Sequence, residues 1–290
     1  MPEENATSAK GTLFLVGTPL GNLEDLTIRA SNLLKKIGWV ACEDTRVTRR
    51  LLSHLGSHAR VFSLRRHNER RALEKVLRHL REGEDVAYCT DAGLPAISDP
   101  GTFLVDGVRA EGFAVVPLPG PTAPSTAVSW SGLEARRWVF LGFLPKLARE
   151  REALLKRFGE LNATLVLFES PHRVRDLLLE IAEYLPNRRV ADCREMTKQN
   201  EECLVGFPEE LLPRVRARGE HVIVVEPDIG KERRKSEGRL SLDLLETLRK
   251  MARFHRNRKA RDVARMAAEI LGIPANEAYG IILEERGERE

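Results

Sequence analysis

The chain has 290 residues, 42% hydrophobic and 31% charged, with a formal net charge of +4. That length suggests about two domains of ordinary size and leaves ample chain for a buried core. We expect a soluble cytoplasmic protein without a metal site, because the sequence lacks a membrane-spanning apolar run, a signal-peptide pattern and any C-x-x-C pair.

The first part of the chain alternates short apolar strands with helical patterns. The predicted strands are residues 12–17, 40–42, 60–64, 85–90 and 113–118, and residues 26–37 and 72–80 have helical spacing. Nearly continuous apolar strands that alternate with helices favour a parallel sheet covered by helices on both faces. We assign residues 11–120 to an N-terminal α/β domain.

A second α/β pattern begins after a proline-rich segment. Its predicted strands are residues 138–144, 164–168, 189–193, 203–207 and 221–226, with a helix over 173–185. Several of these strands are close together in sequence, which favours more antiparallel pairing than in the first domain. We assign residues 121–228 to this second domain.

The end of the chain differs from the rest in its charge. Residues 1–230 contain 32 basic and 32 acidic side chains, so the whole excess of positive charge lies beyond them. Residues 231–265 alone contain 13 basic and 5 acidic groups. Helical patterns over 241–254, 259–271 and 276–286 predict a C-terminal helical domain, residues 239–290, that is basic in its first half. The positive charge indicates either a solvated helix face or a contact with nucleic acid.

Three loops rich in glycine and proline follow predicted strands of the first domain: residues 17–22 (GTPLGN), 90–101 (TDAGLPAISDPG) and 118–123 (LPGPTA). In open α/β sheets ligands bind beyond the carboxyl ends of the strands, so we expect these loops to meet at one crevice. None of them matches a dinucleotide or nucleoside triphosphate fingerprint. The middle loop contains no lysine or arginine, which favours a neutral or cationic ligand.

Polar clusters follow other predicted strands and are expected to form the remaining wall of the crevice. They are residues 43–46, 65–71, 169–173 and 194–198. Part of the second cluster also fits a helix start, so a capping role for Asn68 and its neighbours is an alternative.

Ordered blocks of the sequence resemble the tetrapyrrole methylase family, and within it the subgroup that methylates small-subunit ribosomal RNA. The blocks include GTPLGN, ACEDTRVTRRLL, HNER, DAGLPAISDPG, FESPHR and CREMTKQNEE, and the resemblance covers about residues 11–226 and the helical tail. It implies two α/β domains of the tetrapyrrole methylase type, with S-adenosylmethionine between them. The implied reaction is 2′-O-ribose methylation of a cytidine in the decoding region of 16S ribosomal RNA. The implied partners are that RNA or the small ribosomal subunit and a second copy of the chain.

The resemblance also implies a set of cofactor contacts, with one departure from the family pattern. Leu94 stands where the family usually has threonine, which removes a hydroxyl but leaves the backbone contacts. The implied contacts are Pro19, Leu20, Asp91, Ala92, Gly93, Leu94, Ser98, Thr122, Ala123, Glu169, Ser170, Arg194, Glu195, Glu220 and His221.

Methylation of a ribose hydroxyl benefits from a proton acceptor or a stabilising cation. The candidate acceptors are Glu43, His67, Glu69 and Glu169, and the candidate cations are Arg46 and Lys198, although caps or ion pairs are an alternative role for each. The candidate RNA-binding residues are Arg65, Arg66, Arg253, Arg256, Arg258, Lys259 and Arg261.

Two other functions remain open from the sequence. One is a methyltransferase of the same fold that acts on a tetrapyrrole or another small molecule, which does not need a basic tail. The other is a non-catalytic RNA-binding relative.

Overall fold

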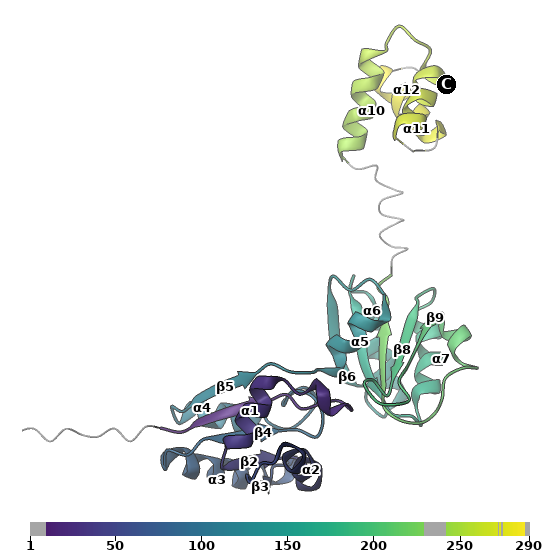
Figure 1. Ribbon diagram of the computed structural model, residues 1–290. Coiled ribbons are helices and arrows are strands. Elements are labelled where there is room, and N and C mark those ends of the chain that lie inside the picture. Colours follow the sequence, from purple (N-terminus) through teal and green to yellow (C-terminus); the bar gives the residue numbers. More distant parts are fainter. Residues whose placement is uncertain (1–9, 229–241, 272, 274, 288–290) are drawn as a thin grey trace, which may run out of the picture. The chain divides into compact units, whose positions relative to one another are not determined.

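The computed structural model describes residues 10–228, 242–271, 273 and 275–287 (Figure 1). The contacts within the chain divide it into an α/β unit, residues 1–227, and a helical unit, residues 228–290. None of the described helices is long and apolar enough to cross a membrane.

The first sheet of the α/β unit has the strand order β3-β2-β4-β1-β5 and is parallel throughout. Its strands are β1 (Thr12–Val16), β2 (Trp39–Cys42), β3 (Arg60–Ser63), β4 (Val86–Cys89) and β5 (Ala114–Leu118). The four helices that pack on it are α1 (Ile28–Lys36), α2 (Thr45–Leu55), α3 (Glu69–Arg81) and α4 (Thr102–Ala110). The predicted parallel sheet is therefore confirmed.

Hydrophobic cores lie on both faces of this sheet, which explains the continuous apolar character of its central strands. In β4, Val86 and Tyr88 pack in the core that contains residues of α3 and α4. The alternate residues Ala87 and Cys89 pack in the core that contains residues of α1 and α2. Because successive side chains of a strand point to opposite faces, a strand covered on both faces has no polar face.

The second sheet has the order β6-β7-β10-β8-β9 and is mixed, as predicted. Only the β6–β7 pair is parallel, and the other three pairs are antiparallel. Its strands are β6 (Trp138–Phe143), β7 (Thr164–Glu169), β8 (Val190–Arg194), β9 (Glu202–Gly206) and β10 (His221–Val225). Helices α6 (Ala148–Gly159), α7 (Val174–Tyr184) and α8 (Pro208–Leu211) contribute to the core on one face. Helix α5 (Ala123–Ser131) contributes to the core on the other.

The helical unit contains α10 (Leu242–Phe254), α11 (Ala260–Leu271) and α12 (Ala275–Arg286). Small and branched apolar residues of the three helices, such as Ala252, Val263 and Ile282, form its own buried core. The three helices predicted from the sequence are confirmed to within about one residue at each end.

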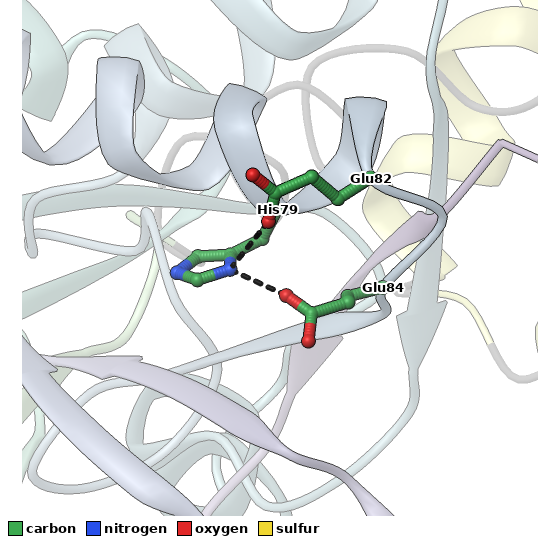
Figure 2. A group of neighbouring side chains, drawn as sticks. All are labelled: His79, Glu82 and Glu84. Atoms are coloured by element: carbon green, nitrogen blue, oxygen red, sulfur yellow. Dashed lines mark hydrogen bonds and ion pairs between the residues drawn. The ribbon is translucent and has the colours of Figure 1, made fainter.

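A buried histidine fastens the end of α3 to the turn before β4 (Figure 2). The His79 ring stacks on Trp39, with 4.1 Å between the ring centroids. Its Nδ1 lies 2.6 Å from Glu84 Oε2 and 3.8 Å from Glu82 Oε2. These three side chains are close enough to hold a metal ion, but both carboxylates lie at the exposed surface. The stacking and the Glu84 contact already account for the position of the ring, so we assign the cluster a structural role.

Candidate active site

The three glycine- and proline-rich loops meet at the carboxyl end of the first sheet. Thr18 and Gly93 exchange two backbone hydrogen bonds, of 2.9 and 3.0 Å, which join the first loop to the second. A Cβ atom on Gly17 would lie only 2.9 Å from the Cα of Gly120, so the first and third loops are also in close contact. Glycine is required at this crossing because there is no room for a side chain.

The loops open onto a cleft of about 420 Å³ that is also lined by loops of the second sheet. This volume lies within the usual range for small-molecule sites. The lining residues are Leu20, Glu43, Asp91–Leu94, Ile97–Asp99, Thr122–Pro124, Phe143, Phe168–Pro171, Met196 and Gly219–Val222.

Strained backbone is concentrated in two of the loops beside the cleft. Ala96 and Ser98, in the long loop after β4, have φ angles of 67° and 65°. Glu195 and Thr197, in the loop after β8, have φ angles of 52° and 65°. Left-handed backbone at residues other than glycine is costly and gathers at functional sites. The strained residues and the cleft therefore indicate the same location for the functional site.

The cleft is acidic. Its described lining contains no lysine or arginine. Glu43, Asp91 and Asp99 lie at one end of it, close enough for their charges to affect one another. Burial, together with the negative charges of Glu43 and Asp91, raises the pKa of Asp99 to about 6, against a smaller opposing effect of Arg66. Burial and the charge of Asp91 also raise the pKa of Glu43. This end of the cleft favours a cation and provides a carboxylate that is more basic than usual.

Most of the cofactor contacts expected from the sequence line this cleft. The exceptions are Pro19, Arg194 and Glu195, which are absent from its lining. Arg194 is buried and lies 3.4 Å from Glu202, and Glu195 accepts a 2.8 Å hydrogen bond from Lys198. Ile97, Asp99 and Met196 also line the cleft. They belong to the loop 90–101 and the cluster 194–198 that were expected at the crevice, but they were not among the implied cofactor contacts, and Phe143 was not expected there at all. Asp99 had a sequence signal, its place in the long loop after a buried strand, whereas Phe143 had none.

Of the candidate catalytic residues, Glu43 and Glu169 line the cleft. The side chain of Glu169 is 1% exposed and bonds to Arg173 through both carboxylate oxygens, at 2.9 and 2.7 Å. Lys198 lies beside the cleft, where it pairs with Glu195 and with the lining residue Glu220 at 2.8 and 3.0 Å.

The other three catalytic candidates lie outside the cleft lining. Arg46 pairs with Asp44 in its own turn, and its side chain is 81% exposed. His67 and Glu69 line a separate surface pocket. Glu69 Oε1 accepts a 3.4 Å hydrogen bond from the backbone N–H of Gly101, so it joins the starts of α3 and α4.

The candidate RNA-binding cations differ in their contacts. Arg65 donates a 3.0 Å hydrogen bond to the carbonyl oxygen of Glu43, and Arg253 pairs with Glu285 at 2.8 Å. The side chains of Arg66, Arg256, Arg258, Lys259 and Arg261 are exposed and make no hydrogen bond or ion pair with other described residues.

The model of the tetrapyrrole (corrin/porphyrin) methylases matches residues 12–212 of the chain. The chain belongs to this family. Solved structures of the same fold include a uroporphyrin-III-C-methyltransferase from Thermus thermophilus, with a TM-score of 0.55 and 21% identity over 76% of this chain and 96% of that one. A cobalt precorrin-4 methyltransferase has a TM-score of 0.57 and 18% identity over 74% of this chain and 94% of that one.

Three curated relatives named ribosomal RNA small subunit methyltransferase I are more similar in sequence. The relative from Escherichia coli O157:H7 is 40% identical and is matched over 98% of this chain and 99% of its own length. The one from Halalkalibacterium halodurans is 44% identical over 75% of this chain and 76% of its own. The one from Coprothermobacter proteolyticus is 44% identical over 74% of this chain and 97% of its own, so it is about as long as the α/β unit alone.

Methyltransferases of this family use S-adenosylmethionine, and so does this protein. The cleft suits that cofactor chemically. Its carboxylates complement a sulfonium cation, and Phe143 and Phe168 provide apolar surface. The described lining has neither lysine nor arginine, which agrees with a ligand that carries no phosphate.

Proposed function

We propose that this protein methylates the ribose 2′-oxygen of a cytidine in the decoding region of small-subunit (16S) ribosomal RNA, with S-adenosylmethionine as the methyl donor. The proposal rests on the cleft, which is lined by carboxylates and contains Asp99, a carboxyl group with a raised pKa. The chain that contains this cleft matches a ribosomal RNA small subunit methyltransferase I over nearly its whole length. We also propose that it works in the cytoplasm as a homodimer.

The reaction needs an oxygen nucleophile at neutral pH, and a ribose hydroxyl is a very weak acid. S-adenosylmethionine, when bound, supplies an electrophilic methyl group on a sulfonium. We propose Asp99 as the acceptor of the hydroxyl proton, because it lines the cleft and its pKa of about 6 leaves it ionised at neutral pH yet more basic than an ordinary aspartate. Glu43 and Asp91 keep this end of the cleft negative, which favours the sulfonium cation.

Other residues act by holding the cleft in shape. Arg173 ties Glu169 to the start of α7, and Lys198 links the loop after β8 to the loop before β10. Such fixed geometry is itself a large contribution to catalysis, because reacting groups need to be aligned closely. We assign Glu169 a positioning role, since its carboxylate is already satisfied by Arg173 and the backbone N–H of Ser170.

The RNA is expected to contact cations that have no acidic partner among the described residues. In the helical unit these are Arg256, Arg258, Lys259 and Arg261, around the junction of α10 and α11. Lysine and arginine bind phosphates without regard to sequence and give salt-dependent affinity.

Deleting residues 231–290 is expected to weaken RNA binding and leave the affinity for S-adenosylmethionine unchanged. The described lining residues of the cleft all lie between Leu20 and Val222, so we expect the cofactor to keep its site. If the four cations of the helical unit each contact a phosphate, the slope of log K against log salt falls by about 3. Filter binding at several salt concentrations measures the affinity for RNA, and calorimetric titration measures the affinity for S-adenosylmethionine. An equal loss of both affinities would mean that the helical unit is structural.

One experiment separates the proposed function from the two alternatives. Calorimetric titration with S-adenosylmethionine is followed by assays of tritiated-methyl transfer to unmodified small ribosomal subunits and to uroporphyrinogen. We expect binding and transfer to the subunits only. Transfer to the tetrapyrrole would favour the small-molecule enzyme, and failure to bind the cofactor would favour the non-catalytic relative.

A further inference from the structure

A second pocket on the α/β unit has a different character from the cofactor cleft. It is lined by residues 66–71 and Phe103 and has a volume of about 650 Å³. We call it the basic pocket. Phe103 lies in the first turn of α4 and is 41% exposed, so its ring is available to a ligand.

The frame of the basic pocket is fixed by hydrogen bonds from different elements. The Asn68 side chain accepts a 2.7 Å hydrogen bond from the Arg65 backbone N–H and donates one of 3.1 Å to the Ser63 carbonyl, which holds the turn between β3 and α3. Glu69 accepts from the backbone N–H of Gly101, which joins that turn to the start of α4 and hence to Phe103.

The pocket is also strongly positive. Arg66, Arg70 and Arg71 are exposed, and none of them forms a hydrogen bond or ion pair with another described residue. Among the described lining residues only Glu69 is acidic, and its Oε1 accepts a hydrogen bond from the Gly101 N–H. Three guanidinium groups beside an exposed aromatic ring make a surface that suits a nucleotide, because phosphates bind the cations and a base stacks on the ring.

The basic pocket lies near the acidic end of the cofactor cleft. Arg66 is near enough for its positive charge to lower the pKa values of both Glu43 and Asp99. The Glu69–Gly101 hydrogen bond links the basic pocket to the loop that contains Asp99. We therefore expect a strand of RNA with one ribose at Asp99 to bring a neighbouring nucleotide near the basic pocket.

We propose that the basic pocket binds an unpaired nucleotide of the RNA substrate next to the methylated one, with its base stacked on Phe103 and its phosphates held by Arg66, Arg70 and Arg71. This inference rests on the proposed function. It adds a second place where the RNA is held, separate from the helical unit.

The test compares the full-length wild type with three variants and a matched control, using unmodified small ribosomal subunits as the probe. Phe103→Ala removes the stacking surface and Phe103→Trp keeps it, while Arg70→Gln with Arg71→Gln removes two cations. Arg78→Gln is the control, because Arg78 is exposed on the same helix but does not line the pocket. Calorimetric titration with S-adenosylmethionine shows that each variant is folded with an intact cleft.

We expect Phe103→Ala to weaken subunit binding about fivefold to a hundredfold. Phe103→Trp and Arg78→Gln should bind as the wild type does. The double arginine variant should lower the salt slope by about 0.7 for each lost phosphate contact. Variants that bind and methylate the subunits as the wild type does would overturn the nucleotide site alone. A wild type that neither binds nor methylates the subunits would overturn the proposed function and the nucleotide site with it.

Discussion

Replacing Asp99 with asparagine is expected to lower the turnover of methyl transfer by about a hundredfold to ten-thousandfold, the usual contribution of a general base. Asparagine keeps the size of the side chain and removes its ability to accept a proton. Asp99 shares the acidic end of the cleft with Glu43 and Asp91, and these charges together with burial raise its pKa to about 6. Single-turnover rates with saturating small ribosomal subunits measure the effect.

The pH dependence gives this prediction a second, independent readout. Because the ionised carboxylate is the active form, the wild-type rate should rise as the pH rises through about 6, and the asparagine variant should lack that rise. Asp106→Asn is the matched control, since Asp106 is exposed on α4 and does not line the cleft. If Glu43→Gln removes the pH dependence and Asp99→Asn does not, the base is Glu43.

The raised pKa of Asp99 also predicts how the stability of the protein depends on pH. The pKa of Asp99 in the folded protein is above its ordinary value of 3.8, so the folded state binds more protons than the unfolded state between about pH 4 and pH 6. The contribution of this group to the free energy of unfolding therefore decreases as the pH rises through that window. Asparagine removes this decrease, so loss of the Asp99 charge does not by itself lower the free energy of unfolding at neutral pH.

Replacing Glu169 with alanine is expected to lower the free energy of unfolding by about 2–3 kcal/mol, because it leaves the Arg173 guanidinium with an unmatched charge in a largely buried position. Glu169 is 1% exposed and Arg173 is 28% exposed, so the arginine recovers only part of its hydration. The affinity for S-adenosylmethionine should fall as well, since Glu169 and Ser170 both line the cleft. Urea denaturation and calorimetric titration check the two effects.

The control for this prediction is Glu152→Ala. Glu152 and Lys156 form an ion pair one helical turn apart on α6, with side chains 39% and 55% exposed. Such exposed pairs contribute only about 0.3–0.5 kcal/mol. An equal, small loss of stability in both variants would show that the Glu169–Arg173 pair is not a significant part of the framework of the cleft.

Much of the fold could be predicted from the sequence because hydrophobic patterning reports burial directly. The four residues of β4 are all buried, and their continuous apolar character is what a strand covered on both faces requires. The close spacing of β8 and β9 likewise predicted antiparallel pairing, which the register of Cys193 opposite Cys203 confirms.

The site could be predicted less completely, because its properties arise from residues that are distant in sequence. The position of the three loops followed from the rule for open α/β sheets. The basicity of Asp99 depends on Glu43, which follows a different strand, and no local pattern reports such a meeting. The left-handed backbone of Ser98 and Glu195 is equally invisible in the sequence. His67 and Glu69 follow a strand of the same sheet and were therefore expected beside the cofactor. They line the basic pocket instead, and no local sequence pattern distinguishes the two positions.

The most direct test of the account is to identify the nucleoside that receives the methyl group. Unmodified small ribosomal subunits are incubated with tritiated S-adenosylmethionine and the wild-type protein or the Asp99→Asn variant, and the RNA is then digested to nucleosides. We predict that the label is found in 2′-O-methylcytidine with the wild type and is strongly reduced with the variant. A label on a base, or no transfer by a protein that binds the cofactor, would contradict the account.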